Sequence, residues 1–317
     1  MDIHRGMKTK TIKAVLAEKF AYLVASIEDE RVRKLVQNNT IITGGAIASM
    51  LLGEPVNDFD LYFTDRETTK AVADYYVTKF KVKKKNGIDC AIFAEMDDAG
   101  RVRIVVKSAG VASAEGAEKP YEYFEGSPEG AAAGYVGEVM GDAGEIEDQN
   151  EQTEALALEA EDAEYRPVFM STNAITLSGR VQIVLRFYGD ADTIHENYDF
   201  VHCTNHWTSR EGVLTLRPAA LESLLSRELR YVGSKYPLCS VIRLRKFIKR
   251  GWVINAGQIL KMLMQVSELN LKDPTVLQDQ LTGVDSAYFI QLMTKIKEKD
   301  PEKIDSAYLC EIIDRMF

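Results

Sequence analysis

The sequence predicts an α+β protein with a mixed sheet, flanking helices, an acidic insertion and a C-terminal helical domain. Three observations support this prediction. Within residues 1–111, segments whose apolar residues recur every three or four positions alternate with short β-branched runs. A middle segment is rich in Ala, Gly and Glu and contains few large apolar residues. After residue 217, the periodic segments all have helical spacing.

The first part of the predicted core covers residues 1–111. Helical spacing from residue 9 to residue 37 predicts two helices, separated near the acidic run 28–30. The β-branched run 40–43 predicts a strand that leads into Gly44 and Gly45. The other elements predicted here are a helix over 46–52, a strand over 59–63, a helix over 67–79 and strands over 80–83, 90–95 and 101–107.

Residues 112–164 form the predicted insertion. From Val111 to Glu164 there are sixteen acidic residues and one lysine, a net charge of −15 that leaves +6 on the rest of a chain whose total is −9. The segment has too few apolar side chains to offset the entropy cost of ordering it, and we therefore expect a flexible surface arm. Its acidic charge suits a basic protein partner. The alternative is that the aromatic run 121–124 docks locally. The positive remainder of the chain permits an anionic partner.

The second half of the chain is predicted to complete the sheet and then become helical. In residues 165–217, strands are expected over 174–177, 181–187, 198–203 and 213–216. Residues 218–317 are expected to form a helical domain, which Pro218 begins at a first helical position. Its predicted helices cover 219–230, 240–250, 257–269, 287–297 and 305–316.

The chemical pattern of greatest interest runs from Gly44 to Phe63. Two glycines between a strand and a helix let backbone N–H groups approach a phosphate at the helix N-terminus. Asp58 and Asp60 are two residues apart at the start of a strand, so they face the same side. Such carboxylates suit Mg²⁺, which binds through a few carboxylates and substrate phosphates. Each feature alone also fits an ordinary turn or cap, and it is their order and spacing that favours a nucleotide site.

This stretch resembles the polymerase-β-type nucleotidyltransferase superfamily, and within it the head domain of CCA-adding enzymes and bacterial poly(A) polymerases. The motif of that group reads approximately GGxxRDxLLGxxxxDxD, and Gly44–Gly45, Leu51–Gly53, Asp58 and Asp60 match it. The Arg-Asp pair of the motif is replaced here by Ala48–Ser49. The resemblance implies a nucleotidyltransferase-like sheet. It also implies transfer of a nucleotide from a nucleoside triphosphate to a hydroxyl acceptor, for which RNA is one candidate.

The resemblance also implies a third carboxylate on a neighbouring strand and two Mg²⁺ ions. Asp199, between Tyr198 and Phe200, is the candidate, and Glu196 is the second choice. The implied catalytic and metal-binding residues are therefore Asp58, Asp60 and Asp199, and the implied phosphate contacts are Gly44, Gly45 and Ser49. A zinc site at His202, Cys203 and His206 is disfavoured, because adjacent residues on a strand face opposite sides.

A basic stretch from Arg227 to Arg250 contains eight basic residues and one acidic residue. Its charge suits the phosphates of a nucleotide or of RNA or another nucleic acid, and Arg243 and Lys246 are the candidate contacts. This stretch also resembles the segment that follows the catalytic strands of CCA-adding enzymes. Cys239–Ser240 stands where those enzymes have Glu-Asp, so CCA addition itself is not expected.

The remaining composition bears on location and on a second hypothesis for the function. Four cysteines without CxxC spacing indicate reduced thiols, and no apolar run is long enough to cross a membrane, so we expect a cytoplasmic protein without a membrane partner. The second hypothesis is a catalytically inactive nucleotidyltransferase-fold protein that serves as a binding or structural component of a larger assembly. The two hypotheses differ in whether Asp199 lies close to Asp58 and Asp60.

Overall fold

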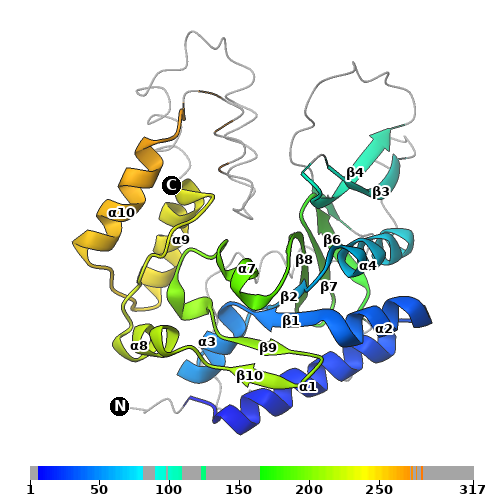
Figure 1. Ribbon diagram of the computed structural model, residues 1–317, viewed down its shortest axis with the longest axis horizontal. Coiled ribbons are helices and arrows are strands. Elements are labelled where there is room, and N and C mark those ends of the chain that lie inside the picture. Colours follow the sequence, from blue (N-terminus) through cyan, green and yellow to red (C-terminus); the bar gives the residue numbers. More distant parts are fainter. Residues whose placement is uncertain are drawn as a thin grey trace. The chain divides into compact units, whose positions relative to one another are not determined.

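The computed structural model describes residues 6–80, 90–97, 99–108, 123–125, 165–271, 273, 276 and 280. Two compact units divide the chain: Met1–Glu196 with His202–Leu224, and Asn197–Val201 with Leu225–Phe317. The first unit contains the sheets and the second contains C-terminal helices (Figure 1). The predicted α+β class, with a mixed sheet and flanking helices, is confirmed. The helices expected over 287–297 and 305–316, and most of the insertion, lie outside the described residues.

The main sheet of the first unit has eight strands among the described residues, in the order β10-β9-β1-β2-β8-β7-β6-β5. The β2 and β8 strands pair in parallel, and the other neighbours pair antiparallel. The strands are β1 (Thr40–Thr43), β2 (Phe59–Phe63), β5 (Tyr123–Glu125), β6 (Pro167–Ser171), β7 (Ala174–Leu177), β8 (Val181–Tyr188), β9 (His206–Thr208) and β10 (Val213–Thr215). A separate hairpin pairs β3 (Cys90–Met96) with β4 (Val102–Ser108).

The helices of the first unit begin where short polar side chains cap them. Asp29 accepts a hydrogen bond from the Val32 amide, and Asp65 accepts one from the Thr68 amide, at 2.9 and 2.8 Å. Such caps satisfy amides that have no partner inside the helix. Asp29 thus explains the break that the acidic run predicted. The helices are α1 (Thr9–Ser26), α2 (Glu30–Asn39), α3 (Gly45–Leu52), α4 (Arg66–Lys79) and α7 (Ala191–His195).

One face of the main sheet packs against the core. Neighbouring strands place apolar residues opposite one another, and all of them are buried: Trp207, Ile42, Leu61, Ile183 and Ile175. Phe20 of α1 contacts the Trp207 ring edge to face, with centroids 5.3 Å apart. In Figure 1, α1 runs along this side of β9 and β10, and α7 lies on the other side of the sheet. The opposite face is therefore the one that can carry polar chemistry.

The second unit is built on aromatic packing and helices. The Phe200 ring contacts the rings of Tyr231 and Phe247, with centroids 5.9 and 5.5 Å apart, and Phe247 contacts Trp252. Its helices include α9 (Pro237–Lys249), which has Pro237 in its first turn, and α10 (Ala256–Ser267). Helix α8 (Pro218–Ser226) continues from the first unit into the second. None of the described helices has the length and apolar character needed to cross a membrane.

The strand expected over 198–203 is wrong. Phe200 makes a single bridge with Tyr231, and Val201–Cys203 is one turn of 3-10 helix. The backbone instead runs beside residues 230–232, because the Val201 amide donates to the Arg230 carbonyl and the Val232 amide donates to the Asp199 carbonyl. Phe200, one of the apolar residues that suggested a strand, lies in the aromatic core of the second unit.

Candidate functional site

A glycine turn joins β1 to α3, as the sequence predicts. Gly44 has a φ of 98°, which residues with a side chain rarely adopt. Its amide donates to the carbonyl oxygen of Cys203 at 3.2 Å, so this N–H group is engaged within the protein. Gly45 is exposed, and a Cβ atom added to it would meet nothing within 4 Å. Backbone amides of the first turn of α3 have no acceptor inside the helix, and Gly44 has no side chain to cap them.

Asp58 and Asp60 lie at the start of β2, beside this turn. Both are half-buried, whereas Phe59 between them is fully buried in the core. Asp60 pairs with Thr43, the residue that precedes Gly44. Directly paired residues share one face of a sheet, so the Asp60 side chain lies on the same face as that of Thr43. The pairing of β1 with β2 thus brings together the two parts of the predicted motif.

A row of polar residues crosses this face of the sheet. Thr43 pairs with His206 on one side and with Asp60 on the other, and Asp60 pairs with Gln182 of β8. The sequence prediction missed Gln182, because glutamine is not a residue type that by itself indicates catalysis. The available signal was a single polar residue between buried Val181 and Ile183.

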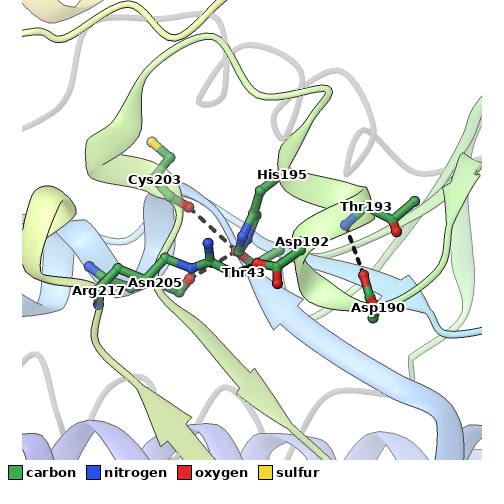
Figure 2. A network of polar contacts seen from close by, with 8 residues as sticks. All are labelled: Thr43, Asp190, Asp192, Thr193, His195, Cys203, Asn205 and Arg217. Carbon is green, nitrogen blue, oxygen red and sulfur yellow. Dashed lines mark hydrogen bonds and ion pairs between the residues drawn. The ribbon is translucent and has the colours of Figure 1, made fainter.

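Thr43 is also the centre of a buried hydrogen-bond network, which Figure 2 shows. Its hydroxyl group lies 2.8 Å from the carbonyl oxygen of Asn205 and 2.8 Å from the Nε2 atom of His195. The single hydroxyl proton goes to the carbonyl, since a carbonyl can only accept. His195 then donates from Nε2, which fixes its tautomer. The backbone amide of Arg217 donates to the Asn205 side chain at 2.8 Å, and the Arg217 guanidinium group pairs with Asp192.

His195 of this network and His206 of β9, which pairs with Thr43, both have lowered pKa values and are uncharged at neutral pH. Burial lowers the pKa of His195 to about 3, and the positive charge of Arg217 acts in the same direction. The pKa of His206 is also lowered, again first by burial and then by Arg217. Their rings lie 5.5 Å apart, so they form a compact uncharged group beside Thr43.

The Mg²⁺ ion that the resemblance implies would need oxygen ligands from side chains near the turn. Asp58 and Asp60 offer carboxylate oxygens and Gln182 offers an amide oxygen, and Mg²⁺ prefers oxygen ligands. Within the described part of the chain, no group of three or more His, Cys, Asp or Glu side chains is arranged to hold a metal ion. The zinc alternative at His202, Cys203 and His206 therefore gains no support.

The other predicted site residues have different surroundings. In the second unit, the buried carboxylate of Asp199 accepts from the Nη1 atom of Arg243 at 2.5 Å. A buried carboxylate needs a compensating charge, and Arg243 supplies it where the sequence argument expected metal ions. Lys246 is exposed on the same helix, α9. In the first unit, Ser49 is buried within α3, more than one turn from its start.

The fold and site define an α+β protein in which Asp60 lies on the polar face of a mixed sheet and pairs with Thr43, the residue that precedes a glycine turn. The model of the "Gabija anti-defense 2 family protein" family matches residues 14–227, which is more than half of the chain and includes this site. The chain belongs to the Gabija anti-defense 2 family. It is 22% identical over 119 residues to "Gabija anti-defense 2" of Bacillus phage SPbetaL7, and this match covers 37% of the chain and 30% of the relative.

The chain is also similar to a solved structure, that of the Thermotoga maritima CCA-adding enzyme complexed with tRNA. The sequence identity is 11%, and the match covers 87% of this chain and 53% of that one. The TM-score is 0.38.

Proposed function

We propose that this chain binds a nucleoside triphosphate on the polar face of its sheet and transfers a nucleotide from it to a hydroxyl acceptor. The observation that carries the proposal is the pairing of Thr43 with Asp60, which brings the glycine turn and the carboxylates to one place. A triphosphate needs both hydrogen-bond donors and a bound cation. The first-turn amides of α3 supply the donors, and Asp58 with Asp60 supplies the ligands for Mg²⁺.

In this proposal the protein contributes mainly positioning and charge. Bound Mg²⁺ would neutralise the phosphate charge that develops during nucleotidyl transfer. The absence of a side chain at Gly45 leaves room for a phosphate close to the backbone. The exposed bases of α9, among them Arg245, Lys246 and Lys249, suit an acceptor with a phosphate backbone such as RNA.

We infer a biological role from the family alone. The name of the relative from Bacillus phage SPbetaL7 describes action against a defence called Gabija. We propose that nucleotide chemistry at this site serves such an anti-defense role. The matched segment covers less than a third of the relative, so the role is a proposal for this chain and not a transfer of a known activity.

The second candidate is a catalytically inactive member that binds a nucleotide or a partner protein. Two observations favour it. The residue beside Asp60 on the neighbouring strand is Gln182 and not a carboxylate, and the Gly44 amide is already engaged by Cys203. The first candidate requires both a bound nucleotide and turnover, whereas the second requires no turnover.

The test combines a binding measurement with a turnover measurement. Purified protein is incubated with each labelled nucleoside triphosphate and Mg²⁺, and both the melting temperature and the release of pyrophosphate are followed. We expect Asp58→Asn with Asp60→Asn to abolish both the nucleotide-dependent rise in melting temperature and any release. Asp74→Asn is the control, because Asp74 is exposed on α4, where it forms an ion pair with Lys70. Binding without release supports the inactive candidate, and no binding of any nucleotide contradicts the first candidate.

A further inference from the structure

We propose that the site holds one divalent cation with its nucleoside triphosphate, and that Gln182 is the residue that limits it to one. The inference rests on the proposed function and specifies the metal content of that same site. It departs from the two ions that the sequence resemblance implies.

Gln182 lies opposite Asp60 on the neighbouring strand. The β2 and β8 strands pair in parallel, and Phe59, Asp60 and Leu61 lie opposite Val181, Gln182 and Ile183. The four flanking apolar residues are all buried in the core. Gln182 must therefore share the opposite face with Asp60, since side chains alternate along a strand. Neighbouring strands lie about 4.8 Å apart, so the Gln182 amide borders any cation that Asp60 binds.

The residues on the other side of Asp60 in this row carry no charge at neutral pH. On the far side of Asp60 the next residue in the row is Thr43, whose hydroxyl group is already bonded to His195 and Asn205. His195 and His206 behind it are neutral because burial lowers the pKa of each. The residues in line with Asp60 on the paired strands, which are His206, Thr43 and Gln182, therefore add no negative charge to the carboxylates of Asp58 and Asp60.

A second cation at this site would need further negatively charged ligands. Two divalent ions in a shared site lie about 3.5–4 Å apart, and their repulsion must be offset by further negative ligands around both. An amide oxygen can bind a cation but brings no charge. With Gln182 in this place, the two aspartates suffice for the cation that accompanies the triphosphate. The place beside Asp60 where a third carboxylate would support a second ion is neutral.

This arrangement has a consequence for turnover. A second ion normally helps to activate the attacking hydroxyl group. A site with one cation binds and orients a triphosphate, and it transfers the nucleotide slowly unless another group supplies that activation. The inference thus connects a single side chain of β8 to the choice between the two candidate functions.

The experiment counts Mn²⁺ ions, which replace Mg²⁺ and are visible by electron paramagnetic resonance. The full chain is titrated with Mn²⁺ in the presence of a non-hydrolysable nucleoside triphosphate analogue, and samples with the analogue alone provide the background. We expect one Mn²⁺ per wild-type chain, and two in Gln182→Glu, with the spectral coupling of a neighbouring pair. Gln37→Glu, which adds the same charge on the exposed surface of α2, is the matched control and should keep one.

The outcomes separate this inference from the proposed function. Two coupled Mn²⁺ ions in the wild-type chain would overturn the inference alone. If Asp199→Asn then reduced the number to one, Asp199 would be the third ligand. No nucleotide-dependent Mn²⁺ at all would overturn the proposed function and the inference with it. The number of Mn²⁺ ions bound per wild-type chain tests the inference even if Gln182→Glu does not fold.

Discussion

Replacement of Thr43 by Val tests whether the buried network holds the glycine turn in place. The two side chains have nearly the same shape, so the change exchanges the hydroxyl group for a methyl group. Thr43 and Asn205 are fully buried and His195 is largely buried. The variant therefore removes the acceptor of the His195 Nε2 proton and the donor to the Asn205 carbonyl oxygen, each at 2.8 Å.

The size of the effect follows from these two losses. A buried polar group that loses its hydrogen bond costs about 1–3 kcal/mol, so we expect the two losses in Thr43→Val to lower the free energy of unfolding by about 2–6 kcal/mol. Urea denaturation measures this change. Thr43→Ser is the control, because it keeps the hydroxyl group and loses one buried methyl group, worth about 1 kcal/mol. If Thr43→Val is as stable as Thr43→Ser, the network does not stabilise the turn and the reasoning is wrong.

Three further predictions concern charge, pH and the glycines. Arg243→Ala leaves the buried Asp199 carboxylate without its partner. The Arg243 side chain is 37% exposed, so we expect the free energy of unfolding, measured by urea denaturation, to fall by about 2 kcal/mol. Removing one partner of a fully buried pair would lower it by about 3–5 kcal/mol. Burial lowers the pKa of folded His195 to about 3, so below the unfolded pKa of about 6.5 only the unfolded state gains its proton. Stability should therefore fall by about 2 kcal/mol from this group between pH 6.5 and pH 5, and His195→Gln should remove that part of the decline. Gly44→Ala should cost about 1–3 kcal/mol because of its positive φ, whereas Gly45→Ala should leave the melting temperature unchanged and reduce its rise with nucleotide.

Local patterns in the sequence were sufficient to predict the glycine turn and the aspartate pair. The strand, turn, helix and next strand follow one another within residues 40–63, and each has a signal of its own in β-branched residues, glycines or apolar spacing. The two-residue period of a strand predicts that Asp58 and Asp60 face the same side, and the structure places Asp60 within β2 and Asp58 immediately before it. The pairing of Asp60 with Thr43 needed the structure, because strand register depends on contacts between strands.

The parts that sequence reasoning missed depend on residues far apart in the chain. Thr43 and His195 are separated by 152 positions, and Asp199 and Arg243 by 44. Nothing near Asp199 in the sequence indicates that an arginine on a later helix will balance its charge. The same holds for Gln182, which gains its interest only from the strand that lies beside it.

The contacts of the glycine turn show which residues must control nucleotide binding if the proposed function is correct. The Gly44 amide donates to the backbone carbonyl of Cys203, and the Thr43 hydroxyl group donates to that of Asn205. The backbone of segment 203–205 therefore holds the turn in position. Side-chain changes in that segment leave these carbonyls in place, whereas a change that shifts its backbone moves the turn and the first-turn amides of α3 together. Because the Gly44 amide is engaged in this way, the phosphate contacts of the proposed function must come from the amides that follow Gly44.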